Sequence, residues 1–157
     1  MKYLIHVLIL VVLIVFTSTF LDLKKVAGQS MEPTLKNGQL VIFRRSLAAI
    51  NPSRADVVLY KKENDQGLHI GRVIGLPLES IRITKGNVYL DDNDQKYRLL
   101  EEYLPANTKT VSYTPGDWVK VENYKYFIIG DNRQDVINIK DNFVHRNDIM
   151  GIFLLKF

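Results

Sequence analysis

The sequence predicts a mainly β fold, a curled sheet or barrel, preceded by one N-terminal transmembrane helix. Three observations predict this class. Residues 3–21 form a strongly apolar run. From Gly38 onward, short apolar segments alternate with turn signals, and no helical array separates them. The chain has 157 residues, which is enough for one domain of ordinary size with an appendage.

The apolar run reads YLIHVLILVVLIVFTSTFL. As a helix its residues would extend about 28 Å, close to the ~30 Å hydrocarbon core of a bilayer. A cleaved signal peptide is the alternative, but no small-residue A-x-A-like site follows the run. We therefore expect a retained anchor over residues 1–25 and a β domain over residues 26–157. The amino terminus and Lys2 on one side nearly balance Lys24 and Lys25 on the other, so the charge bias does not set the orientation.

Strands are predicted where β-branched and aromatic residues lie between turn signals. The predicted strands are Leu40–Arg44, Val57–Tyr60, His69–Ile74, Ser80–Thr84, Val88–Leu90, Trp118–Val121, Tyr126–Ile129 and Gly151–Phe157. Lys85-Gly86-Asn87 is predicted to be a hairpin turn, and Asp91-Asp92-Asn93-Asp94 a solvated turn.

The composition excludes several kinds of chemistry. The chain has no cysteine, so it has no disulfide, no thiolate metal site and no cysteine nucleophile. With only three histidines, we expect no metal site and no cofactor. The net charge of +4 comes from interleaved acidic and basic residues. Because no polybasic stripe is present, we expect no nucleic-acid partner.

Four short motifs could carry chemistry, and each alone has an ordinary structural explanation. Ser30 follows a glycine and precedes a stiff Met-Glu-Pro-Thr turn, where a serine commonly serves only as a cap. The motifs are Ser-Met-Glu-Pro-Thr-Leu (30–35), Arg-Ala-Asp-Val-Val-Leu-Tyr (54–60), Gly-Arg-Val-Ile-Gly-Leu-Pro (71–77) and Gly-Asp-Asn-Arg (130–133).

Taken in this order, the motifs resemble those of the bacterial signal peptidase I family, over nearly the whole chain. The resemblance implies a membrane-anchored serine endopeptidase that removes signal peptides on the extracytoplasmic side of the plasma membrane. It implies that Ser30 is the nucleophile and that its backbone N–H helps to bind the oxyanion. It also implies supporting roles for Arg72, Asp131 and Arg133, with the last two holding their loop against the active-site strands.

This sequence departs from the family pattern at the general base. Gly71 stands where the family has a lysine, directly before Arg72. Val136, Asn138 and Lys140 replace a serine, an aspartate and an arginine of the family pattern. Losing a general base typically lowers the rate by about 10²–10⁴-fold.

His69 is the candidate substitute for the missing base. Residues two apart on a strand point to the same face, so His69 and Gly71 share one. We expect the imidazole to be able to lean into the space left open at Gly71. The alternative is that His69 is an ordinary, half-exposed strand residue.

Two functions remain open at this point. The first is a signal peptidase I-type endopeptidase whose partners are the signal peptides of exported precursors and the lipid bilayer. The second is a catalytically impaired homologue that binds precursors or regulates an active signal peptidase partner. The retained Ser30 motif favours the first function, and the loss of the lysine favours the second.

Overall fold

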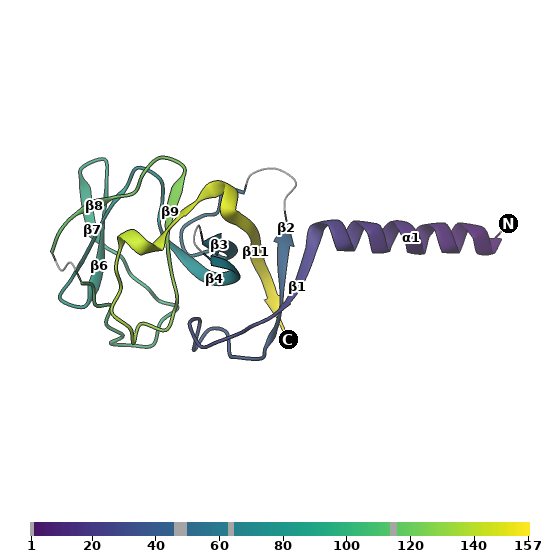
Figure 1. Cartoon of the computed structure of the whole chain (residues 1–157), viewed down its shortest axis with the longest axis horizontal. Coiled ribbons are helices and arrows are strands. Elements are labelled where there is room, and N and C mark those ends of the chain that lie inside the picture. The colour runs from purple at the N-terminus through teal and green to yellow at the C-terminus, as the bar shows by residue number, and fades with distance from the viewer. Residues whose placement is uncertain (1, 46–49, 63–64, 114–115) are drawn as a thin grey trace.

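The computed structural model describes residues 2–45, 50–62, 65–113 and 116–157. Met1, which belongs to the expected anchor segment, lies outside the described residues. Helix α1 (Lys2–Phe20) projects as a single rod away from a body made of strands (Figure 1). Its apolar side chains are largely exposed along its length. Within the described part of the chain, no helix meets the length and apolarity that crossing a membrane requires.

The larger sheet has seven strands in the order β1-β2-β11-β3-β4-β9-β10, and its neighbours pair antiparallel. Its strands are β1 (Leu21–Lys25), β2 (Leu40–Arg45), β3 (Val57–Lys62), β4 (Asp65–Gly75), β9 (Lys125–Ile129), β10 (Phe143–His145) and β11 (Ile149–Lys156). Short 3-10 helices at Lys140–Asn142 and Arg146–Asp148 flank β10. This order brings three parts of the chain together at one site. They are the segment before β2, strand β4 and the end of β9.

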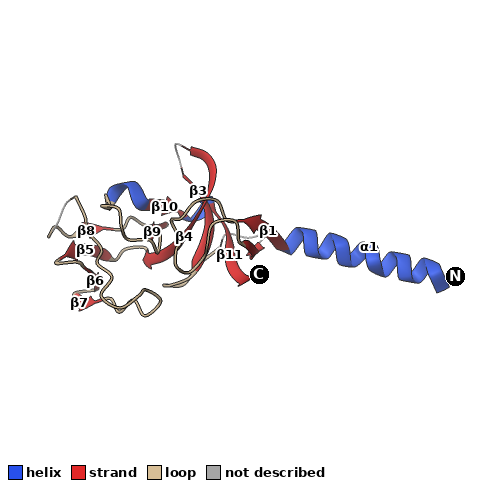
Figure 2. Cartoon of the chain, turned by 90° about the horizontal axis from the view of Figure 1, so that it is seen from below, coloured by secondary structure: helices blue, strands red, loops and turns tan. Residues whose placement is uncertain are grey.

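The smaller sheet lies at the end of the molecule away from α1 (Figures 1 and 2). Its strands are β5 (Ser80–Thr84), β6 (Asn87–Asp92), β7 (Gln95–Arg98) and β8 (Val119–Lys120), in the order β7-β6-β5-β8. Lys85 and Gly86 have φ values of 51° and 79° and join Thr84 to its partner Asn87. Positive φ at both central residues is the geometry of a two-residue hairpin turn, so the predicted hairpin is confirmed.

The core forms three clusters of buried apolar residues. One joins the smaller sheet to β4 and β9 and contains Ile74, Ile81 and Phe127. A second lies under β3, β4 and β9 and contains Val58, Tyr60 and Ile128. The third contains Met31 and Leu35 from the segment between β1 and β2. The site segment is therefore attached to the sheet through its own buried side chains.

Every predicted strand overlaps an observed one, and the mainly β fold is confirmed. The structure adds β1, β7 and β10, which were not predicted. Residues 21–25, grouped above with the anchor, form β1 and pair with β2. Asp56 accepts a hydrogen bond from the Ser53 N–H at 2.8 Å, which closes the turn before β3.

Candidate active site

Ser30 lies on a tight turn between β1 and β2, and its side chain is exposed. The Leu35 N–H donates to the Met31 carbonyl at 2.9 Å, and both of these side chains are fully buried. Burying these two apolar side chains fixes the turn to the core while the serine stays outside. Among the described residues, no hydrogen-bond partner is found for the Ser30 hydroxyl. The hydroxyl is thus held in place by its backbone and is available to a ligand.

The loop after β9 holds the backbone of this turn. The Asn132 N–H donates to the Ser30 carbonyl at 3.0 Å, and the Asn132 side-chain amide donates to the Gln29 carbonyl at 3.2 Å. Gly130 approaches so closely that a Cβ there would lie 2.2 Å from the Ser30 carbonyl oxygen. Only glycine allows this approach, so the contact between the two segments requires Gly130.

A buried ion pair fixes the same loop to β4. Arg72 donates to both carboxylate oxygens of Asp131, at 2.8 and 2.5 Å. Thr34 donates its hydroxyl proton to Asp131 at 2.5 Å. The Arg72 guanidinium also stacks 3.9 Å from the centre of the Tyr103 ring. Asp131 is thus held at β4 by hydrogen bonds from Arg72 and Thr34.

Arg133 fixes the other side of the loop. Its guanidinium donates to the Gly130 carbonyl at 2.8 Å, to the Thr110 hydroxyl at 2.6 Å and to the Glu101 carboxylate at 2.5 Å. Tyr103 donates to the same Glu101 carboxylate at 2.7 Å. Burial raises the pKa of the Tyr103 phenol well above its ordinary range, and the Glu101 carboxylate adds to this. Tyr103 therefore remains a neutral donor between the two guanidinium groups.

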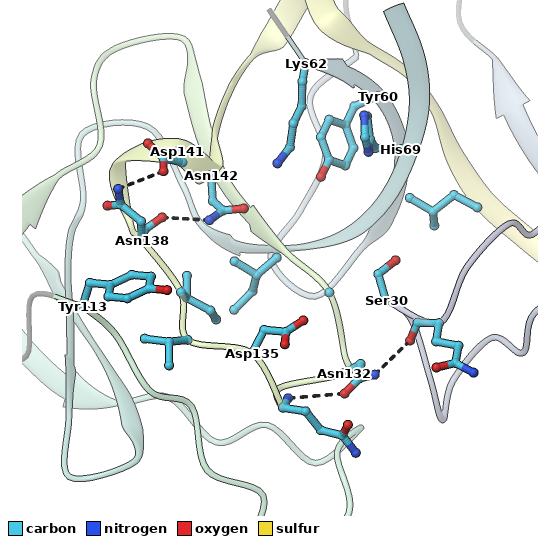
Figure 3. Close-up of a pocket in the computed structure, with 17 residues that line it drawn as sticks. Ser30, Tyr60, Lys62, His69, Tyr113, Asn132, Asp135, Asn138, Asp141 and Asn142 are labelled. Carbon is cyan, nitrogen blue, oxygen red and sulfur yellow. Dashed lines mark hydrogen bonds between the residues drawn. The ribbon is translucent and has the colours of Figure 1, made fainter. Parts of the chain in front are cut away.

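Ser30 lines a cleft of about 720 Å³ (Figure 3). One wall comes from β3 and β4, through Tyr60, Lys62, His69 and Ile70. The opposite wall is mostly polar and comes from the segment after β9. Its residues are Asn132, Gln134, Asp135, Val136, Ile137, Asn138, Asp141 and Asn142. The sequence analysis named Val136 and Asn138 as departures from the family pattern and Asn132 as part of the Gly-Asp-Asn-Arg motif. It did not single out the other residues of this wall.

His69 lines this cleft, as does Ser30, and its ring is half-buried. Its Nε2 atom lies 2.8 Å from a carboxylate oxygen of Asp65. Its ring lies against Tyr60, with centroids 5.7 Å apart. Burial raises the pKa of Tyr60 to about 12, so this phenol is protonated at neutral pH. The structure thus brings Ser30 and His69 to one cleft and adds Asp65 and Tyr60, which the sequence analysis did not connect with them.

The space beside Gly71 is not open, so the expectation that an imidazole could lean into it is wrong. A Cβ on Gly71 would lie 2.7 Å from the Ile128 Cγ2 atom and 3.2 Å from the Tyr60 Cε1 atom. Tyr60 pairs with His69 in the register of β3 and β4, which puts its ring over the neighbouring Gly71. The volume next to Gly71 is therefore filled by an aromatic ring and an isoleucine methyl group.

Within the described ranges, no group of three or more His, Asp or Glu side chains is arranged to hold a metal ion. The turn and the cleft together define a candidate serine hydrolase, in which the exposed Ser30 hydroxyl stands on a stiff turn beside an open cleft.

The comparisons with known proteins identify the family. The family model described as signal peptidase, peptidase S26, matches residues 1–154. The chain is 31% identical to a probable signal peptidase I-2 of Synechocystis sp., over 94% of this chain and 68% of that protein. It is 30% identical to signal peptidase I P of Bacillus subtilis subsp. natto, over 96% of this chain and 85% of that protein. The chain therefore belongs to the signal peptidase family, peptidase S26.

A solved structure supports the same fold. The crystal structure of a signal peptidase I from Enterococcus faecalis V583 superposes with a TM-score of 0.52 at 20% sequence identity. The match covers 68% of this chain and all of that one. The mainly β architecture predicted from the sequence is thus the architecture of a signal peptidase I.

Proposed function

We propose that the protein is a signal peptidase I-type serine endopeptidase and that Ser30 is its nucleophile. The observation that carries the proposal is the placement of Ser30, exposed at a large cleft while Asn132 holds its carbonyl. A nucleophile must be rigid in its backbone and free at its reacting atom, and Ser30 has both properties. The family membership of the chain supports the choice of reaction.

The proposed reaction is acyl transfer from a peptide bond to Ser30. A base removes the proton of the hydroxyl while Oγ bonds to the scissile carbonyl carbon. The Ser30 backbone N–H stabilises the negative charge that develops on the carbonyl oxygen. The leaving amine then takes the proton from the base, and water hydrolyses the acyl-enzyme. We assign the role of base to His69, because it lines the cleft that Ser30 lines.

The proposed substrates are exported precursors with small residues on either side of one variable residue before the cleavage site. Relatives that match nearly this whole chain carry the name signal peptidase I. The cleft has a volume of about 720 Å³, and Ser30 lies at its lining. Arg72, Asp131 and Arg133 support the site by holding the loop that contacts Ser30.

We further propose that α1 anchors the chain in the plasma membrane, with residues 26–157 on the extracytoplasmic side. Its aliphatic side chains are more than half exposed at most positions, which is costly in water. A lipid environment would remove that cost. Anchoring enzyme and precursor in one membrane would also raise their effective concentration. Membrane fractionation of the full chain and of a form lacking residues 2–20 tests this anchor.

The runner-up is a catalytically impaired homologue that binds precursors or regulates an active signal peptidase. The observation in its favour is Gly71, whose neighbouring space is filled by Tyr60 and Ile128. This chain therefore has neither the lysine of the family pattern nor the space beside residue 71 that its side chain would need. The cleft and the Ser30 turn would still bind an extended peptide.

Cleavage of a precursor separates the two functions. The full chain, in detergent micelles, is incubated with a precursor that carries an Ala-x-Ala site, with Ser30→Ala as the control. Serine-dependent cleavage at that site supports the peptidase. If the wild type binds the precursor but leaves it uncut, the impaired homologue is the correct assignment.

A further inference from the structure

Asp65 and His69 form a pair at the start of β4, at the edge of the cleft. The Asp65 Oδ2 atom lies 2.8 Å from His69 Nε2. A carboxylate can only accept a hydrogen bond, so Nε2 must carry the proton. The other ring nitrogen, Nδ1, then holds a lone pair when the imidazole is neutral. The contact therefore selects the tautomer in which Nδ1 is the proton acceptor.

The Asp65 carboxylate is itself held in place. Its second oxygen, Oδ1, accepts the Gly67 N–H at 2.8 Å, in a turn closed two residues further on. This backbone hydrogen bond, together with the one from His69, holds the pKa of Asp65 below its ordinary value. The carboxylate is thus ionised at neutral pH, and one of its oxygens is fixed by the main chain while the other faces the imidazole.

Tyr60 fixes the other side of the imidazole. It stands opposite His69 in the β3–β4 register, and their rings are tilted by 34° at 5.7 Å. Only 5% of Tyr60 is exposed, so its ring is a rigid surface formed by the core. The imidazole thus has an aromatic ring on one face and a carboxylate at one nitrogen. Both restraints lower the number of orientations that it can adopt.

Other charged groups also face this cleft. Lys62 lines it from β3, and Asp135 and Asp141 line the opposite wall. Lys62 also acts electrostatically on Asp65. No hydrogen bond or ion pair joins any of these three described side chains to His69, whereas Asp65 touches it directly. Asp65 is therefore the acidic group whose removal should affect the imidazole most.

We infer that Asp65 is a positioning residue, which sets the tautomer and the orientation of His69 for proton transfer from Ser30. The inference rests on the proposed function. The proton leaves Ser30 Oγ for His69 Nδ1 and passes from there to the leaving amine. Asp65 accepts no proton in this sequence; it stabilises the imidazolium that forms in between. An Asp–His pair at the start of β4 thus replaces the lysine that Gly71 has displaced.

Asp65→Asn is the central variant, because it keeps the size of the side chain and removes its charge. Asp65→Glu restores the charge, and Asp94→Asn makes the same chemical change in the exposed β6–β7 turn, away from the cleft. The full-length proteins are assayed with an internally quenched peptide that carries an Ala-Gln-Ala site. We expect Asp65→Asn to lower kcat by about 10- to 100-fold with little change in KM. Asp65→Glu should recover part of the loss, and Asp94→Asn should match the wild type.

Two readouts distinguish positioning from a merely structural role. Without the carboxylate the imidazolium is less stable, so the acid limb of the kcat/KM profile should move to lower pH in Asp65→Asn. Added imidazole should restore cleavage to His69→Ala but not to Ser30→Ala.

The failures of the two proposals are distinguishable. If cleavage depends on Ser30 and His69 but Asp65→Asn keeps the rate and pH profile of the wild type, Asp65 has no positioning role and the peptidase assignment stands. If cleavage depends on Ser30 but not on His69, the pair is not the base and the inference is overturned. If the wild type cleaves nothing, both proposals fail.

Discussion

The ring of Tyr60 packs over Gly71, with its Cε1 atom 3.2 Å from the position that a Cβ on residue 71 would take. The second obstacle is the Ile128 Cγ2 atom, at 2.7 Å from the same position. Both neighbours are buried in one core cluster and have little freedom to move. The glycine at this position is therefore demanded by packing, whatever the site does chemically.

Gly71→Ala should consequently destabilise the protein by about 1–3 kcal/mol, the usual effect of overpacking a core. Gly71→Lys carries the same Cβ and should lose stability as well, without gaining cleavage activity. Urea denaturation measures both effects. Ile128→Leu removes the branch at Cβ and should make the Gly71→Ala loss smaller, so the double variant is less destabilised than the sum of the single ones. Additive losses would show that Ile128 is not the obstacle.

Breaking the Arg72–Asp131 pair should be strongly destabilising. Asp131 is 2% exposed and accepts from Arg72 and Thr34, so removing it leaves a buried guanidinium without its partner. We expect Asp131→Leu to lower the free energy of unfolding by about 3–5 kcal/mol. Glu122→Gln, which removes the exposed Lys125–Glu122 pair, is the matched control and should cost less than about 1 kcal/mol. Similar losses in the two variants, measured by urea denaturation, would contradict the role given to the buried pair.

The local parts of this structure could be predicted from the sequence. Strand periodicity and the Lys85-Gly86 turn depend on neighbours in the chain, and both were correct. Strand β7 was missed because all four of its residues are exposed and polar, so no apolar alternation identifies it. Strand β1 was missed because its first residue, Leu21, directly continues the apolar run of α1.

The candidate site also has parts that the sequence predicts and parts that only the folded structure shows. Ser30 and the Gly130 loop are visible as motifs, but their contact joins residues 100 positions apart and needs the folded sheet. The filling of the space at Gly71 depends on Tyr60 and Ile128 from two neighbouring strands, which periodicity does not place. The Asp65–His69 pair has a local signal, an Asp-x-Gly turn just before the histidine. The role proposed for the pair depends on its place at the edge of the cleft, which only the structure shows.

The stability of the sheet edge near α1 should depend on pH through Asp22. Burial raises the pKa of this carboxyl, but hydrogen bonds and charge from Arg45 and Lys24 outweigh burial and lower it. A lowered folded-state pKa stabilises the fold above the unfolded-state value of about 4, and the stabilisation is lost as the pH falls through the folded-state value. The difference in unfolding free energy between wild type and Asp22→Asn should therefore be constant near neutral pH and shrink below about pH 4. A difference that persists at pH 2 would show that the carboxylate charge is not its source.

Gly130→Ala tests whether the loop after β9 sets the position of Ser30. The added methyl group would lie 2.2 Å from the Ser30 carbonyl oxygen and 3.0 Å from its carbonyl carbon, and both are backbone atoms that cannot rotate away. The two segments must separate, which weakens the hydrogen bond from the Asn132 N–H to Ser30. Since a displacement of about 1 Å can lower a rate by about 10²-fold, we expect kcat to fall by at least 10-fold.

The matched control is Gly116→Ala, at a glycine with φ of 98° where the nearest atom to an added Cβ is a flexible arginine terminus at 4.0 Å. This variant carries backbone strain from its positive φ without a steric clash, and it lies outside the cleft lining. Comparing kcat at a temperature where both variants are folded by circular dichroism separates lost positioning from lost stability. If Gly130→Ala is folded and cleaves as fast as Gly116→Ala, the carbonyl of Ser30 tolerates displacement, and the loop contributes to the fold alone.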